Sequence, residues 1–186
     1  MNHENKRTTL DIVLVGLFAA VIYLGIQFFR IPLPAATGAP FLHFGNIFFL
    51  LSVLLLGSKQ GALAGGIGFI LFDVLNGYIT VIPKVAILTV LMAFASGAVF
   101  RILSKKKHIV VSVSIAVTVA FLISLTGDFL YDTLLLLLSG SELLPAMWAA
   151  FTSLLATVIN SVFGIIAITI LYAPLRYALE KVQKGK

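Results

Sequence analysis

The stretch from Ile109 to Leu138 reads IVVSVSIAVTVAFLISLTGDFLYDTLLLLL, and it decides the fold class. Its only charged residues are Asp128 and Asp132, both near its end. A helix needs about 20 apolar residues to cross the roughly 30 Å hydrocarbon core of a bilayer. This run therefore predicts a membrane-spanning helix that is long enough to tilt or to project beyond the bilayer.

The whole chain has the composition of a membrane protein. Of its 186 residues, 60% are hydrophobic and 11% are charged, and the mean hydropathy is +1.12. A soluble domain of this size needs far more charge to cover its surface, so the composition excludes one. We expect residues 1–186 to form a single integral membrane domain, an all-α bundle of six transmembrane helices.

Polar, proline and glycine breaks divide the chain into six apolar segments. We expect the spans at residues 10–29, 47–56, 62–74, 82–103, 109–138 and 147–172. Pro32 and Pro34 stop the first helix and favour an extended loop up to Phe41. The N-terminus is polar and the first apolar run ends without a small-residue cleavage pattern, which indicates a retained helix rather than a signal peptide.

The lysines and arginines predict the orientation. With both termini inside, Arg30 and Lys84 are the only outer ones of the 13 lysines and arginines, which leaves eleven on the inner side. Cytoplasmic loops of membrane proteins carry such an excess of positive charge. We therefore expect an N-in, C-in protein of the bacterial cytoplasmic membrane. The formal net charge of +6 then marks a cytoplasmic rim and not a nucleic-acid surface.

In this orientation the polar groups of several spans gather near the outer face. Asp128 and Asp132 are four residues apart and share a helix face. Carboxylates within a bilayer are costly and usually face a cavity or a partner. We therefore predict an outward-opening pocket with these candidate contacts: His43, Asn46, Asp73, Asn76, Tyr78, Lys84, Asp128, Tyr131, Asp132 and Trp148.

Simpler explanations exist for these residues. Exposure to outer water would account for the two late aspartates of the fifth span, and snorkelling would account for Lys84. Trp148 and Tyr78 suit the aromatic belt of a membrane interface. We expect Asn160, near the middle of the sixth span, to form an interhelix hydrogen bond and not a ligand contact.

Sequence motifs for chemistry are absent from the chain. It has no cysteine, which excludes thiolate metal sites and cysteine nucleophiles. It has no P-loop, so it cannot energise transport itself, and it has no G-x-S-x-G or H-E-x-x-H motif. We expect no catalytic residue, no metal site and no cofactor in this chain, and a binder that depends on a partner.

Three motifs lie within residues 41–78: FLHFGN at 41–46, LLLGSKQGALAGGIG at 54–68 and DVLNGY at 73–78. Together with the six spans and the length, they resemble the substrate-binding S components of energy-coupling factor (ECF) vitamin transporters. Those proteins read approximately F-x-H-L-G-D, L-L-G-P-x-x-G-x-x-x-G-x-x-G and D-L-x-x-G-Y. The resemblance implies a subunit that captures a vitamin at the outer face. It also implies docking on a module of a transmembrane scaffold and two ATPases, which consume the ATP.

The resemblance also suggests roles for particular residues. Gly16 and Ala20, with Ala19 adjacent, form a small-residue pair that lets another helix approach closely, although internal packing would explain it too. In the family such a pair on the first helix mediates docking. The segment from Arg30 to Phe41 would be the lid, and the fourth to sixth helices would line the pocket.

The substrate depends on which polar groups the ligand meets. The most similar subgroup includes proteins for pantothenate, hydroxymethylpyrimidine and pyridoxine. We expect pantothenate first, because Lys84, an outer lysine set against the charge bias, invites an anion. A pyridine or pyrimidine ring would instead use aromatic stacking with Asp128 or Asp132. Two other classes stay open: a small intramembrane enzyme that uses these aspartates on a lipid head group, and a structural subunit whose polar groups only pack helices.

Overall fold

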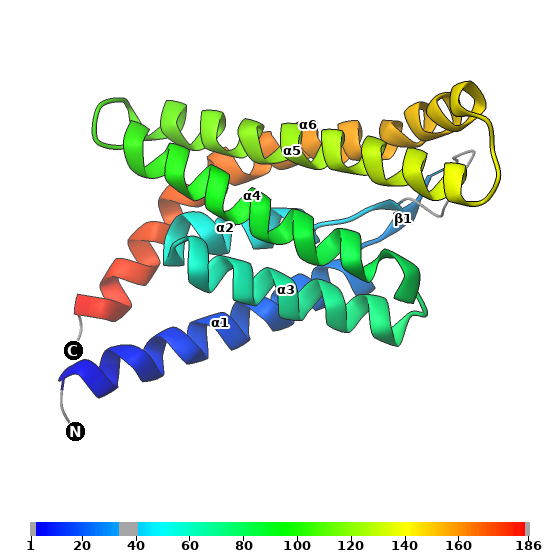
Figure 1. Ribbon diagram of the computed structural model, residues 1–186. Coiled ribbons are helices and arrows are strands. Elements are labelled where there is room, and N and C mark those ends of the chain that lie inside the picture. Colours follow the sequence, from blue (N-terminus) through cyan, green and yellow to red (C-terminus); the bar gives the residue numbers. More distant parts are fainter. Residues whose placement is uncertain (1–2, 34–40, 185–186) are drawn as a thin grey trace.

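The computed structural model describes residues 3–33 and 41–184, and in them the chain is almost entirely helical (Figure 1). The elements are α1 (His3–Gln27), β1 (Ile31–Pro32), β2 (Phe41–Leu42), α2 (Gly45–Leu56), α3 (Ser58–Leu75), the 3-10 turn η1 (Ile79–Val81), α4 (Ile82–Leu103), α5 (Ile109–Leu138) and α6 (Leu143–Lys184). The predicted lid, Arg30 to Phe41, falls partly on residues 34–40, which lie outside the described residues.

The short helix α2 lies at the centre of the bundle. It packs against α1, α3, α4 and α6. Eight of its residues are buried, among them Phe49, Leu50 and Leu51, which have no exposed surface. Since protein surrounds α2 on so many sides, its nearly continuous apolar sequence is core and not a lipid-facing surface. In Figure 1, α2 lies between the α5–α6 pair and the α1–α3 pair.

Four helical segments are long and apolar enough to cross a membrane, by length and composition, within the part of the chain that the structure describes. They are Thr9–Gln27, Ile79–Leu103, Ile109–Leu138 and Leu143–Val182. The expectation of six spanning helices is not confirmed, because neither α2 nor α3 is among these four segments. The 12 residues of α2 give a length of about 18 Å, which is shorter than a bilayer core. The start of α1 and the end of α6 lie at the same end of the bundle (Figure 1), which fits an even number of crossings. The N-in, C-in orientation stays a prediction.

The glycines of α3 allow close helix contacts, with one exception. A Cβ at Gly61 would lie 2.5 Å from the Val53 Cα of α2, and a Cβ at Gly68 would lie 2.8 Å from the Ala19 carbonyl oxygen of α1. Gly66, by contrast, has nothing within 4 Å of such a Cβ. The glycine-rich sequence of α3 thus lets α1 and α2 approach its backbone, whereas Gly66 is not part of a contact.

Two short strands, each of two residues, pair with each other just before α2 begins. β1 and β2 are antiparallel, with Ile31 opposite Leu42 and Pro32 opposite Phe41. β2 also contacts α6. The strand pairing and the contact with α6 hold Phe41 beside α6.

Candidate functional site

A cavity of about 580 Å³ lies between α3, α4, α5 and α6, with β2 and the start of α2 along one side. Small-molecule sites in proteins measure about 300–1,000 Å³. Eight of the ten predicted contact residues line it: His43, Asn46, Asp73, Tyr78, Lys84, Asp128, Tyr131 and Asp132. The structure thus brings together residues that lie up to 89 positions apart, from His43 to Asp132.

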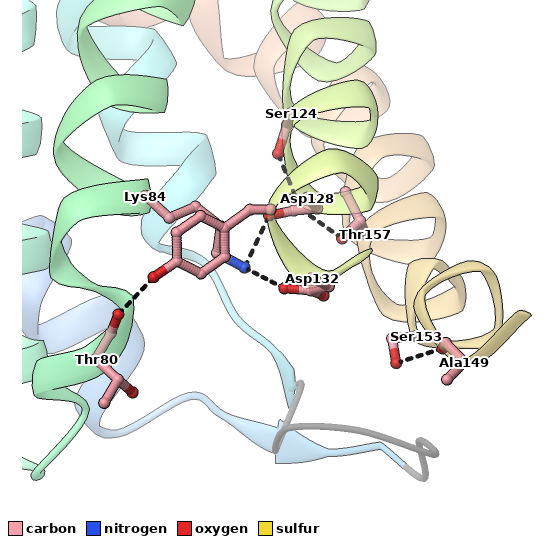
Figure 2. A network of polar contacts seen from close by, with 9 residues as sticks. Thr80, Lys84, Ser124, Asp128, Asp132, Ala149, Ser153 and Thr157 are labelled. Atoms are coloured by element: carbon pink, nitrogen blue, oxygen red, sulfur yellow. Dashed lines mark hydrogen bonds and ion pairs between the residues drawn. The ribbon is translucent and has the colours of Figure 1, made fainter. Parts of the chain in front are cut away.

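Lys84 bridges the two aspartates of α5 (Figure 2). Its Nζ lies 3.2 Å from Asp128 Oδ1 and 3.3 Å from Asp132 Oδ1. The three side chains are between 16% and 25% exposed, so little water screens the ion pairs. The aspartates meet Lys84 because residues four apart share one face of α5, and this face packs against the start of α4.

Neighbouring polar groups complete this network. Asp128 Oδ2 accepts hydrogen bonds from the Thr157 hydroxyl of α6 at 3.0 Å and from the Ser124 hydroxyl at 3.4 Å (Figure 2). The Tyr131 hydroxyl donates to the Thr80 carbonyl oxygen at 2.7 Å. Both carboxylate oxygens of Asp128 therefore have partners. We call this side of the cavity the paired wall: Lys84, Ser124, Asp128, Tyr131, Asp132 and Thr157.

Another part of the cavity lining carries aromatic rings. The rings of Phe72 and Tyr78 stack with centroids 5.9 Å apart and an interplanar angle of 17°. Phe41 meets Phe72 edge-on at 5.8 Å, and it lies 5.4 Å from the His43 ring. We call this side the aromatic wall: Phe41, His43, Phe69, Phe72, Asp73 and Tyr78. It offers an apolar surface of the kind on which a flat ring packs.

Asp73 is the charged residue of the aromatic wall. It is 7% exposed and lines the cavity from the last turns of α3. Its Oδ2 is buried and has no hydrogen-bond partner among the described residues. A buried carboxylate oxygen without a partner is costly, so the position needs an explanation.

His43 and Asn160 connect the loop around β2 to α6. Asn160 accepts a hydrogen bond from the His43 backbone N–H at 3.1 Å and donates to the Phe41 carbonyl oxygen at 3.0 Å. His43 Nδ1 accepts from the Gly45 N–H at 3.1 Å. Burial lowers the pKa of His43 from 6.5 to about 4, so the imidazole is neutral at pH 7 and its proton is on Nε2.

Two predicted contact residues lie outside the cavity. Asn76 donates to Gln27 Oε1 at 3.1 Å and accepts from Arg30 at 3.3 Å, so it joins the end of α3 to the end of α1. Arg30 also lies over the Phe72 ring, 5.5 Å from its centroid. Trp148 is 65% exposed and meets the Phe151 ring edge-on, on a face of α6 that does not line the cavity.

Sequence reasoning missed several polar residues of the site. Ser124 and Thr157 bind Asp128, and Asn160 lines the cavity although we expected only an interhelix contact. A usable signal exists in α6, because Ser153, Thr157 and Asn160 recur at i, i+4 and i+7 and all three line the cavity. A polar stripe at helical spacing in an apolar helix indicates an inward face.

The predicted docking residues of α1 lie on two different faces. Gly16 and Ala20 are exposed, and a Cβ at Gly16 would meet nothing within 4 Å. Ala19 is 5% exposed and packs against Gly68 of α3. The strip open to another helix is thus Gly16 and Ala20, while Ala19 belongs to the internal contact.

Comparisons with known proteins bear on the identity of the chain. A curated protein of Pyrococcus woesei, described as an uncharacterized protein in gap 3'region, is 38% identical over 76 residues, which are 41% of this chain and 47% of that protein. The chain thus spans about half the length of this relative. The family described as ECF-type riboflavin transporter, S component, matches residues 6–177. The chain therefore belongs to the family of S components of ECF-type riboflavin transporters.

Proposed function

We propose that this chain is the substrate-binding subunit of an ECF-type importer and holds one water-soluble vitamin in the cavity between α3 and α6. The observation that carries the proposal is the cavity itself, with about 580 Å³ between an aromatic wall and a paired polar wall. Apolar surface with a few placed polar groups is typical of small-molecule sites. S components are transporter subunits and not enzymes, and the family assignment supports the same role here.

The cavity favours a vitamin with a flat heteroaromatic ring. The aromatic wall can pack on the ring, and the polar groups of the cavity can bind its nitrogen, carbonyl or hydroxyl groups. Riboflavin, which the family description names, has this chemistry and is our first candidate. The earlier expectation of pantothenate depended on a free outer lysine. Lys84 already pairs with Asp128 and Asp132, so that argument loses its basis.

The hypothesis of an intramembrane enzyme requires Asp128 and Asp132 to act on a substrate. Both carboxylates lie in ion pairs with Lys84, and Asp128 also accepts two hydroxyl hydrogen bonds. This arrangement suits a structural support of the binding site better than a reacting pair. The transporter role therefore has the stronger support.

Vitamin binding is tested on the purified full chain. Mass spectrometry of the denatured protein should identify a retained vitamin, and calorimetry with riboflavin, pyridoxine, thiamin, biotin and pantothenate should find tight binding without ATP. A heteroaromatic vitamin should bind best. No retained ligand, together with no binding across this panel, would falsify the proposal.

Docking on the ECF module would use the Gly16–Ala20 strip. The strip has the small residues and the exposure that a close helix contact needs. Ala20→Trp should abolish vitamin uptake by cells that also express the scaffold and the two ATPases, while the affinity of the purified chain stays unchanged. A parallel loss of affinity would contradict this division of roles.

A further inference from the structure

The three carboxylates of the cavity differ in their partners. Asp128 and Asp132 both pair with Lys84, whereas Asp73 Oδ2 is buried without a partner among the described residues. A carboxylate oxygen can only accept hydrogen bonds when the group is ionised. Asp73 is therefore placed to receive a donor that the protein itself does not provide.

We propose that Asp73 selects the ligand by charge. It accepts a hydrogen bond from an N–H or O–H group of an uncharged or cationic vitamin, and it rejects ligands that carry a carboxylate or a phosphate. This inference rests on the proposed function, since it assigns the chemical class of the ligand to the same cavity.

The charge balance of the cavity supports this selection. Three carboxylates and one ammonium line it, and His43 is neutral, so the formal charge of the lining is −2. Arg30, the other outer cation, does not line the cavity and is engaged by Asn76 and the Phe72 ring. Residues 34–40, which read PAATGAP, hold no charged side chain that could offset the balance.

Two effects would weaken the binding of an anionic ligand at this site. It would bring negative charge into a negative, poorly solvated space, where like charges repel strongly. It would also leave Asp73 Oδ2 unpaired unless another group of the ligand donated to it. An uncharged vitamin with ring N–H or hydroxyl donors gives Asp73 Oδ2 a hydrogen-bond partner and adds no charge to the cavity.

Matched ligand pairs test the selection. The full chain in detergent is titrated with riboflavin and riboflavin 5′-phosphate, and with pyridoxine and its 5′-phosphate. For the pair whose parent binds, we expect the phosphate to bind at least tenfold more weakly. An equally tight phosphate would overturn the charge selection and leave the proposed function intact. If neither these compounds nor any other vitamin of the panel above binds, the proposed function fails, and this inference falls with it; tight binding of pantothenate or biotin, which carry a carboxylate, would overturn this inference alone.

Variants separate the role of Asp73 from the shape of the cavity. Asp73→Asn keeps the side-chain volume and removes the charge. It should weaken binding of the parent vitamin at least tenfold and reduce the discrimination against the phosphate. Asp73→Ser gives a second test if the asparagine variant does not fold. Asp11→Asn, which removes an exposed carboxylate of α1, is the control and should bind like the original chain. Unchanged affinity and unchanged discrimination in the folded Asp73 variants would refute the assignment.

Discussion

The paired wall and the aromatic wall handle buried charge in opposite ways. On the paired wall, Asp128 has a partner for each oxygen although it is partly exposed. On the aromatic wall, the more deeply buried Asp73 has an oxygen without a partner. Packing alone would satisfy the more deeply buried group first, because its desolvation costs more. In our proposal, Asp73 is the carboxylate left open for a ligand, whereas the ion pairs and hydrogen bonds of the paired wall also hold α4, α5 and α6 together.

The largest expected loss of stability comes from removing Lys84, which pairs with both aspartates of the paired wall. Lys84→Met leaves Asp128 and Asp132 close together without a cation, and breaking a buried ion pair costs about 3–5 kcal/mol. We expect a loss near the lower bound, because the side chains are partly exposed. Denaturant titration in detergent, followed by the fluorescence of Trp148, measures it. Lys59→Met removes an exposed lysine and should change the stability little; a loss as large as that of Lys84→Met would contradict the role of the network.

The neutral state of His43 sharpens the comparison, because His43 adds no positive charge to the aromatic wall. The pKa of His43 is lowered from 6.5 to about 4 by burial, so the unfolded chain binds the proton at higher pH than the folded chain does. The stability is fully present above about pH 6.5 and falls as the pH is lowered toward 4, at about 1.4 kcal/mol per unit and by no more than about 3 kcal/mol.

The carboxylates of the cavity also titrate at acidic pH, so the effect of His43 is measured as a difference. The pH profile of stability is recorded for the original chain and for His43→Gln, and the loss between pH 6.5 and 4 should shrink in the variant. His108→Gln, at an exposed histidine, should keep the original profile. Identical profiles for all three proteins would refute the assignment.

The support of the aromatic wall can be weakened through α3. Gly61→Ala places a Cβ 2.5 Å from the Val53 Cα, so α2 and α3 must separate. Overpacking of this kind costs about 1–3 kcal/mol. The melting temperature should fall for Gly61→Ala and stay level or rise slightly for Gly66→Ala, whose Cβ meets nothing within 4 Å. A drop of the same size in both variants would show that the contact of Gly61 with Val53 does not decide the effect.

The connection between the loop and α6 is the smallest of the four effects. Asn160→Ala removes the partners of the His43 N–H and the Phe41 carbonyl oxygen. We expect a loss of about 1 kcal/mol, at the low end for unpaired groups, because water in the cavity can reach them. Thr152→Ala, an exposed residue of the same helix, is the control. If the two variants unfold alike, the connection carries no measurable stability.

Much of the helix pattern could be predicted from the sequence. The fourth and fifth segments were expected at 82–103 and 109–138, and α4 and α5 have these bounds. Proline at the start of one and a lysine-rich break between them mark these ends clearly. The helix α6 extends beyond the span expected at 147–172. It begins at Leu143 and continues through Pro174 to Lys184, and the ion pair of Arg176 with Glu180 at 2.9 Å supports its last exposed turns.

The partners within the site could be predicted only in part. The shared face of Asp128 and Asp132 follows from helical spacing alone. That Lys84 would pair with both depends on how α4 packs against α5, which hydropathy does not specify. The placement of Trp148 shows the same limit, since its rotation on α6 points it away from the cavity.

The hydrogen bonds between Asn160 and the backbone of the β2 loop bear on the route by which a ligand could reach the cavity. Asn160 lies about 26 Å along α6 from its first residue, so the backbone at Phe41 and His43 meets α6 far from the helix end. Hydrocarbon offers no hydrogen-bond partners to a backbone that leaves such a contact. Sideways displacement of β2 into lipid would strand these groups, whereas movement toward water would hydrate them. On our proposal, a vitamin would therefore enter the cavity from the aqueous phase and not laterally from the bilayer.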